Sequence, residues 1–527
     1  MSLKLLTEIY SSFDPFVPSG AATYVDFREA RGGWNVLQDM GRRITRSRQT
    51  TCQLFSGYRG SGKSTELLRL KEYLEQQKYF VVYFQADEDI ELQDTSYVDI
   101  LFTCVRHLAE AIKLRQNNPL LNWMKFRWDS LKDLARTEIS IDNLSQEAQI
   151  SQFAKITANL KVAPSQRYEL RQKINLDSTS LLLALNDFIQ EAQKSVIPEF
   201  RGLVVIADNL DRIVEINQGN AYSNLNEIYI NRSEIWRNLG CHVILTIPVS
   251  MVYSKRGVTL QDNYDSPNIL PMIMVRNADG SVNQIGLQKL REFVCRRIIV
   301  ISENLDKEIE GSIFESKELV DQLCLMSGGQ PRNLMLLIQS AIARTDELPI
   351  KLASVQRAFQ ELKEVYYRTI QSDQWEVLAR VYCSKQAENN EKYLHLLGNR
   401  SILEYRYYDA DGTLKVWVDV NPLITGISQF QKALPTAGSE LIEAVDAIDS
   451  IVIDGLKEVV ENYKIFLERQ QYDKVTEIAG NAYTMLNKTA ESLDKESAAY
   501  GRVVALAEYW RLVKNLYAVR SGYDVTK

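Results

Sequence analysis

The sequence predicts an α/β protein in which an open parallel sheet is followed by helical modules. Three observations support this fold class. Short apolar runs rich in β-branched and aromatic residues alternate with helical segments, which is the pattern of a parallel sheet. A glycine-rich loop joins the first apolar run to a helix, and residues 287–365 contain no good strand. The predicted strands are residues 51–55, 79–84, 202–207 and 242–247, with a further candidate at 269–275.

Length and composition place the chain among ordinary globular proteins. Its 527 residues suffice for about three domains, with 45% apolar and 25% charged residues. A net charge of −6 gives no overall reason to expect nucleic acid or an anionic membrane, although a local basic face stays open. The six cysteines are isolated and there are only three histidines, so we expect reduced thiols and no zinc site. With no signal-like or 18-residue apolar run, we expect a cytoplasmic protein without membrane contact.

The loop after the first strand has the pattern of a phosphate-binding loop. It fits G-x-x-x-x-G-K-[ST], with Gly57, Gly62, Lys63 and Ser64 in the fixed places. Glycines let backbone N–H groups turn toward an anion, and the start of the following helix adds its positive dipole end. A chance match in a glycine-containing turn is the alternative, but the flanking strand and helix favour nucleotide binding. The predicted binding residues are Gly57, Tyr58, Arg59, Gly60, Ser61, Gly62, Lys63, Ser64 and Thr65.

A carboxylate for magnesium is expected at the end of the strand 202–207. Asp208 follows this strand directly, and Mg²⁺ that bridges phosphates takes one or two carboxylates. We therefore predict that Ser64 and Asp208 hold Mg²⁺, while Lys63 reaches the β- and γ-phosphates. The alternative for Asp208 is a turn or capping residue. Asp211 is a candidate for orienting the attacking water, and its alternative is an ion pair with Arg212.

The motifs resemble those of one branch of the P-loop NTPases. One extra strand lies between the loop and Asp208, and this arrangement resembles the additional-strand branch that includes AAA+ and STAND proteins. Within it, the run Asp208-Asn209-Leu210-Asp211-Arg212 is similar to the STAND and initiator-type pattern. The resemblance implies ATP as the nucleotide and Thr246 as a sensor residue, with a plain strand-end threonine as the alternative.

The resemblance also implies a closing lid. Gly328-Gly329-Gln330-Pro331-Arg332-Asn333 resembles the lid motif in which an arginine opens a helix, and Arg332 would then reach the γ-phosphate. A surface arginine at a helix start is the alternative. Active AAA+ enzymes carry a glutamate directly after the aspartate that Asp208 matches (the Walker B position), whereas this chain has Asn209. We therefore expect slow turnover.

Further modules are expected beyond the lid. Helical segments at 375–383 and 391–397 precede two strands around the Asp411-Gly412 turn, which suggests a winged helix. Its would-be recognition segment, 387–394, carries two acids and one lysine, so DNA is possible but not favoured. The predicted domains are a P-loop NTPase domain at 1–285 with a helical insertion at about 115–175, a helical lid at 286–368, a winged-helix-like domain at 369–432 and a C-terminal helical domain at 433–527.

We interpret the chain as an ATP-binding and ATP-hydrolysing switch. The resemblance implies a homo-oligomer in the ATP state and signalling to a separate effector protein, in a prokaryotic stress or antiviral pathway. Two alternatives stay open. One is a DNA-binding AAA+ ATPase of the initiator or transposition type, and the other is a scaffold that binds nucleotide without hydrolysing it.

Overall fold

The computed structural model divides the chain into two compact units, which we describe separately. The sheet unit is Asn35–Leu270, and the helical unit is Met1–Trp34 together with Pro271–Lys527. No helix among the described residues is long and apolar enough to cross a membrane. All six cysteines are free thiols. The structure describes every residue except 1, 34, 113–118, 121, 123–163, 196, 217–222, 302–308, 389, 410, 435–449, 470, 494–499, 501–502, 505, 508, 512, 515–516 and 518–527.

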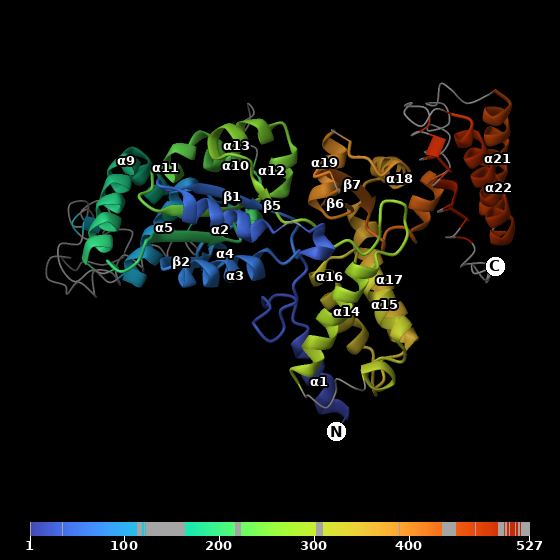
Figure 1. Ribbon diagram of the computed structural model, residues 1–527, viewed down its shortest axis with the longest axis horizontal. Helices are drawn as coiled ribbons and strands as arrows, with labels where there is room; N and C mark the ends of the chain where they lie inside the picture. The colour runs from blue at the N-terminus through green and yellow to red at the C-terminus, as the bar shows by residue number, and fades with distance from the viewer. Residues whose placement is uncertain are drawn as a thin grey trace. The chain divides into compact units, whose positions relative to one another are not determined.

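A five-stranded parallel sheet organises the sheet unit (Figure 1). The strand order is β2-β3-β4-β1-β5, and every neighbouring pair is parallel. This confirms the predicted open parallel α/β sheet. In a parallel sheet all carboxyl ends meet at one edge, where ligands of such folds bind. The strands are β1 (Cys52–Ser56), β2 (Tyr79–Gln85), β3 (Gly202–Asp208), β4 (His242–Ile247) and β5 (Asn268–Ile269).

Helices cover both faces of this sheet. Alternate residues of β3 and β4 point to opposite faces, and both sets are buried, as expected for a parallel sheet between helices. One face packs against α5 (Tyr97–Ile112), α9 (Pro164–Ser195), α11 (Ser233–Arg237) and α13 (Arg256–Tyr264). The other packs against α2 (Val36–Arg46) and α3 (Lys63–Gln76). Short segments complete the unit: α4 (Ala86–Asp89), η3 (Leu210–Arg212), α10 (Asn224–Asn226), η4 (Glu227–Asn231) and α12 (Val249–Tyr253).

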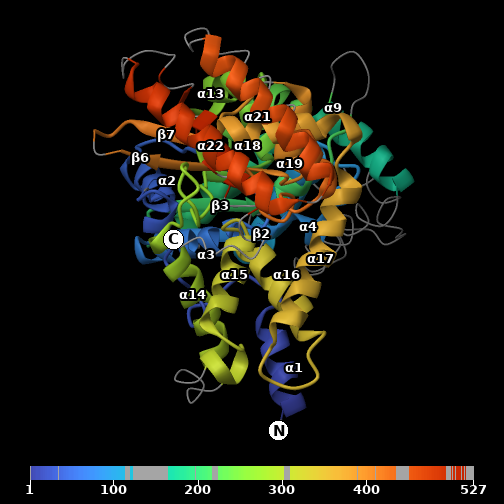
Figure 2. The same cartoon turned by 90° about the vertical axis from the view of Figure 1, so that its right-hand side faces the viewer.

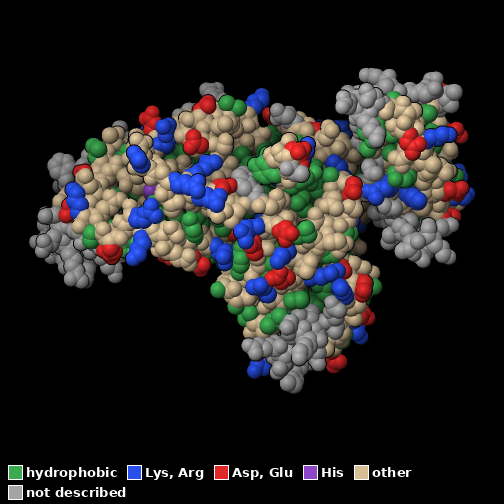
Figure 3. All heavy atoms as spheres, viewed as in Figure 1, with side chains coloured by type: hydrophobic (Ala, Val, Ile, Leu, Met, Phe, Trp, Pro, Cys, Tyr) green, Lys and Arg blue, Asp and Glu red, His purple; other side chains and the backbone are tan. Residues whose placement is uncertain are grey.

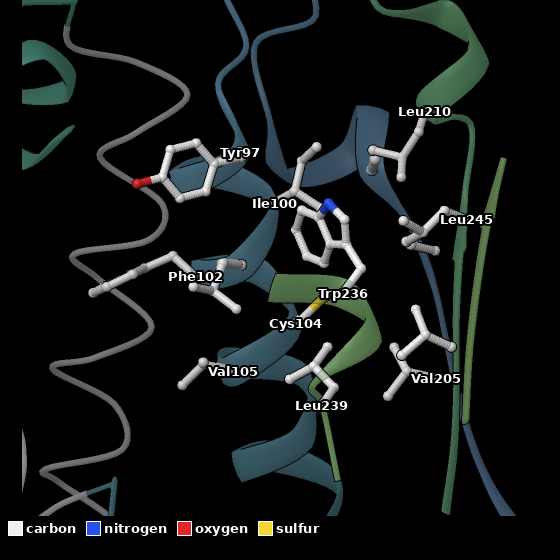
Figure 4. Close-up of a cluster of buried hydrophobic side chains, with 14 of the residues drawn as sticks. Tyr97, Ile100, Phe102, Cys104, Val105, Val205, Leu210, Trp236, Leu239 and Leu245 are labelled. Carbon is white, nitrogen blue, oxygen red and sulfur yellow. The ribbon is translucent and has the colours of Figure 1, made fainter. Parts of the chain in front are cut away.

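The core on the first face is a single apolar cluster. Figure 4 shows Trp236 of α11 beside Ile100 and Cys104 of α5, with Val205 and Leu245 contributed by the sheet. All five side chains are at most 1% exposed. Burying so much apolar surface on both sides fixes the register of the strands, and thereby the positions of the loops at the carboxyl edge.

The strand candidate at 269–275 is wrong beyond its first residue. The strand β5 is only Asn268–Ile269, and residues 270–275 continue as irregular chain. Pro271 has no N–H to donate to a neighbouring strand, and the N–H of Met274 bonds to Ala30 instead. The apolar run reflects burial, since Leu270, Met272, Ile273, Met274 and Val275 are all buried. Most of the predicted insertion at 115–175 lies outside the described residues.

The helical unit contains helical layers and one hairpin. The helices α16 and α17 pack together, as do α21 and α22, which run side by side in Figure 2. Its helices are α1 (Ser2–Ser12), η1 (Glu29–Arg31), α14 (Gln284–Ile299), η6 (Ile309–Ile313), α15 (Lys317–Met326), α16 (Pro331–Ile342), α17 (Leu352–Thr369), η7 (Ser372–Gln374), α18 (Trp375–Ser384), α19 (Glu391–Gly398), α21 (Ser450–Glu468) and α22 (Tyr472–Glu491).

The hairpin joins β6 (Ile402–Tyr408) to β7 (Leu414–Val420) in antiparallel register. Tyr405 and Trp417 are directly opposite and stack with ring centroids 4.4 Å apart. Two helices followed by this hairpin are the elements that the sequence predicted at 375–418, and their identity as a winged helix stays a prediction.

Candidate nucleotide-binding site

The glycine-rich loop lies between β1 and α3, at the carboxyl edge of the sheet. Gly57, Gly60 and Gly62 all have positive φ, at 150°, 82° and 102°. Other residues rarely adopt these angles, so the path of the loop depends on its glycines. A Cβ at Gly57 would lie 3.1 Å from the carbonyl oxygen of Leu270, which leaves little room for a side chain. The first N–H groups of α3 lack intrahelical acceptors by helix geometry, so the loop ends at a natural anion site.

Lys63 is held at the mouth of this loop. Its Nζ donates to the carbonyl oxygens of Gly57 at 2.8 Å and Tyr58 at 3.0 Å. The same ammonium lies 3.1 Å from a carboxylate oxygen of Asp211, and both side chains are nearly buried, at 6% and 5% exposed. Two loop carbonyls and one carboxylate therefore hold this ammonium in place beside the loop.

Asp208 and Ser64, the predicted magnesium residues, meet in the structure. The Ser64 hydroxyl donates to the Asp208 carboxylate, which also accepts from the Tyr83 hydroxyl at 2.8 Å and the Asn209 N–H at 2.7 Å. Burial raises the pKa of Asp208, and the nearby charge of Asp211 raises it further. A cation at this point would offset that cost, because it stabilises the ionised form.

The turn after Asp208 directs the side chain of Asp211 toward Lys63. Asn209 adopts a left-handed conformation with φ of 63°, which asparagine tolerates better than most residues. This lets η3 start at once and places Asp211 beside Lys63. Arg212 does not pair with Asp211; its guanidinium pairs with Asp87. The guanidinium of Arg59 approaches the backbone oxygen of Asp211 at 3.5 Å.

Thr246 at the end of β4 braces the same turn. Its hydroxyl accepts from the Leu210 N–H at 2.9 Å and lies 3.3 Å from the carbonyl oxygen of Ala207. The side chain is fully buried. Thr246 thus connects β4 to the turn that carries Asp211, and its sensor role stays a prediction.

Arg332 belongs to the helical unit. It stands in the first turn of α16, after Gly328 and Gly329, which have positive φ. Its Nε donates to the carbonyl oxygen of Pro15 at 3.1 Å, and its guanidinium lies 5.6 Å from the centroid of the Phe16 ring. The predicted approach of Arg332 to a nucleotide stays a prediction.

Sequence reasoning missed a group of polar residues at the end of β2. Strand β2 pairs with β3 so that Gln85 lies opposite Asp208. The Asn209 Nδ2 donates to Gln85 at 3.1 Å and to Asp87 at 2.7 Å. The acidic run Asp87-Glu88-Asp89, directly after a predicted strand, was the available signal.

The donor set fits magnesium bound together with a nucleotide. Among the described residues, no group of three or more His, Cys, Asp or Glu side chains could hold a metal alone. One hydroxyl and one carboxylate are instead what Mg²⁺ takes from a protein when phosphates and water supply its other ligands. Ser64 and Asp208 would hold the ion, which would supply positive charge at the phosphates.

Comparisons with known proteins give structural likeness only. No family model matches the chain, and no curated protein matches it. Among solved structures, the chain is similar to a Walker-type ATPase of Pyrococcus abyssi, with 13% identity, a TM-score of 0.36, and coverage of 80% of this chain and 99% of that one. It is similar to the Aeropyrum pernix ORC1 protein in complex with DNA, with 12% identity, a TM-score of 0.32, and coverage of 80% of this chain and 94% of that one. It is also similar to Cdc6p of Pyrobaculum aerophilum, with 12% identity, a TM-score of 0.36, and coverage of 81% of this chain and 98% of that one. Likeness at this level assigns no activity, ligand or partner to this chain.

Proposed function

We propose that this chain is an ATP-binding and ATP-hydrolysing molecular switch. The observation that carries the proposal is the convergence of the Gly57–Thr65 loop, Lys63 and the Ser64–Asp208 pair at one edge of the sheet. Backbone N–H groups and Lys63 would hold the phosphates, while Ser64 and Asp208 would hold Mg²⁺.

The Lys63–Asp211 ion pair would connect nucleotide binding to movement. Phosphates that attract Lys63 weaken its contact with Asp211, and Asp211 lies on the turn braced by Thr246. Entry of ATP would thereby change the conformation of the turn after β3, which carries Asp211. Arg332 would close a lid over the nucleotide, and the resulting change would drive oligomerisation and signalling to a separate effector, such as one in prokaryotic antiviral defence.

Phosphate release tests the enzymatic part of this proposal. Wild type, Lys63→Ala and Asp211→Asn would be compared at saturating Mg-ATP. We expect turnover by wild type and a loss of roughly a hundredfold in Lys63→Ala, since removal of one charge-stabilising donor costs that much in other enzymes. Wild-type turnover no faster than that of Lys63→Ala would instead favour the non-hydrolysing scaffold. Light scattering with ATP, with ADP and without nucleotide tests the oligomeric switch.

A second candidate, an ATPase that also binds nucleic acid, is favoured by one surface. From Met40 to Thr65 the chain has no acidic residue, and Arg42, Arg43, Arg46 and Arg48 are all exposed. In Figure 3, Lys and Arg side chains gather over α2 and the start of β1. We call this the arginine surface. It lies near the amino ends of β1 and β4, opposite to the edge proposed for the nucleotide.

The chemistry of the arginine surface suits phosphates. Arg43, Arg46 and Arg237 line an open hollow of about 800 Å³, together with two acids, Asp262 and Asp265, and with polar neighbours that include Ser47 and Thr50. Among the described residues, none of the exposed large hydrophobic side chains lies at 36–56 or 237–240. Protein interfaces usually need an apolar centre, whereas nucleic-acid interfaces are polar and positive.

Salt dependence tests this second candidate. Arg43→Gln/Arg46→Gln/Arg237→Gln would be compared with Lys255→Gln/Lys317→Gln/Lys351→Gln, which removes the same charge from other exposed positions. If the surface binds duplex DNA, the arginine variant lowers the salt slope by about one for each lost phosphate contact, and the control does not. Absence of DNA binding by wild type at low salt eliminates the candidate.

A further inference from the structure

The position after Asp208 lacks a carboxylate. Asn209 stands there, and its uncharged amide accepts a weaker hydrogen bond from water than a carboxylate does. Its side chain turns instead toward the end of β2, where its Nδ2 donates to Asp87 Oδ1 at 2.7 Å. The next acid along the chain, Asp211, is engaged with Lys63. The site thus has a carboxylate beside Asn209, but it comes from the segment that follows β2.

The sheet itself delivers this carboxylate. Strands β2 and β3 are in parallel register, with Gln85 opposite Asp208, so the residues after β2 emerge beside the turn at Asn209. The short helix α4 begins at Ala86 and ends at Asp89. Asp87 is then fixed from two sides, by Asn209 and by the guanidinium of Arg212. Its side chain is 23% exposed, so water reaches it, whereas Asp208 is fully buried.

The two neighbouring acids have other partners. Glu88 is exposed and accepts from the Gln85 amide at 2.9 Å. Asp89 turns toward α5, where it pairs with Arg106 at 2.5 Å and His107 at 2.7 Å. Of the three consecutive acids, Asp87 is the one whose carboxylate bonds to the residue after the magnesium aspartate.

We propose that Asp87 orients the water that attacks the γ-phosphate, in the place of the missing acid at position 209. This inference rests on the proposed ATP hydrolysis. The attacking water forms a bond from its oxygen to the γ-phosphorus while the bond from that phosphorus to the bridging oxygen breaks. ADP leaves with the electron pair of that bond, and the water proton passes to the product phosphate. Asp87 accepts a hydrogen bond from the water and thereby fixes its direction, which is the main requirement of phosphoryl transfer.

The test separates turnover from nucleotide binding. Phosphate release at saturating Mg-ATP and ATP affinity by calorimetry would be measured on full-length wild type, Asp87→Asn, Asp87→Glu, Glu88→Gln and Lys63→Ala. We expect Asp87→Asn to lower turnover at least tenfold, and up to about a hundredfold, with ATP affinity changed less than threefold. Asp87→Glu keeps the charge and is expected to recover part of the activity. Glu88→Gln, the same chemical change one residue along, is expected to stay within threefold of wild type.

Three outcomes would overturn the assignment. Asp87→Asn could turn over within twofold of wild type, or Glu88→Gln could show the loss instead. Asp87→Asn could also lose ATP affinity as much as turnover, which would indicate a purely structural role. All three leave ATP hydrolysis itself in place. Wild-type turnover no faster than that of Lys63→Ala would remove the proposed function and this assignment together.

Discussion

The two edges of the sheet hold their charges in opposite ways. At the carboxyl edge, Asp208 and Asp211 are buried, and each contacts a hydroxyl, an N–H or an ammonium. At the amino edge, Arg43, Arg46 and Arg237 are exposed around an open hollow. A buried charge without partners is costly, whereas an exposed charge is well hydrated. At the carboxyl edge, the partners of each buried acid therefore fix its position. At the amino edge, the exposed arginines act through the positive potential that they give the surface.

The difference shows where mutations should matter. At the carboxyl edge, removal of one group leaves another buried group without its partner, so effects should be large and specific. At the amino edge, effects of surface arginines should be small, additive and sensitive to salt.

The largest effect is expected from Asp208→Asn. Turnover should fall roughly a hundredfold because the carboxylate that we propose for magnesium is lost. The pKa of Asp208 is raised by burial, so ionisation costs the folded state free energy, and stability falls as the pH rises through that pKa. The variant should therefore melt higher than wild type at pH 7 without nucleotide. Thermal melts check the predicted rise in melting temperature, and phosphate release checks the predicted fall in turnover. Asp262→Asn, at an exposed position, is a control that should change neither quantity.

A pH effect of intermediate size is expected from His242, a buried residue at the amino edge. Burial lowers its pKa to about 4, and its Nδ1 lies 3.1 Å from the Thr51 N–H. Because the pKa in the folded state lies below that of the unfolded chain, the contribution is present above about pH 6.5 and is lost as the pH falls toward 4. Unfolding free energy should drop by about 2 kcal/mol between pH 7 and pH 5 from this group.

Urea unfolding of wild type and His242→Gln at both pH values checks this effect. Glutamine keeps a hydrogen-bond acceptor but does not titrate, so the variant should lose less stability on acidification. Parallel pH profiles for the two proteins would show that His242 is not responsible.

A smaller effect on turnover, about tenfold, is expected when the side chains of Asp87 and Asn209 are exchanged. The double variant Asp87→Asn/Asn209→Asp keeps one amide and one carboxylate in the pair that now spans 2.7 Å. Aspartate tolerates the left-handed backbone of position 209. Turnover should rise about tenfold above that of Asp87→Asn alone. Equal phosphate release by the single and double variants would mean that the carboxylate is not needed at this place.

Local sequence signals predicted the loop of the candidate site, whereas its contacts with residues after β2 come from long-range strand pairing. The loop at Gly57–Thr65 was predictable because its glycines, its lysine and the flanking elements are contiguous. The contact between Asn209 and Asp87 depends on the register of β2 against β3, which joins residues more than 100 positions apart. No local pattern fixes such a register.

The same distinction explains the error in the sheet. The apolar run at 269–275 indicated burial correctly, but Pro271 and the bond from Met274 to Ala30 ended the strand at Ile269. Burial and strand pairing are separate properties, and apolar composition reports only the first. The arginine surface, in contrast, can be recognised from the sequence, because four of its arginines lie between positions 42 and 48.

Calorimetric titration of the full-length protein with Mg-ATP tests the central claim, a nucleotide site at the carboxyl edge, most directly. Wild type should bind one ATP per chain with a Kd between roughly 1 μM and 1 mM, the usual range for enzyme substrates. Lys63→Ala should bind at least tenfold more weakly, since its ammonium is the cation held at the loop. Absence of saturable heat with wild type, or identical titrations for the two proteins, would contradict the account.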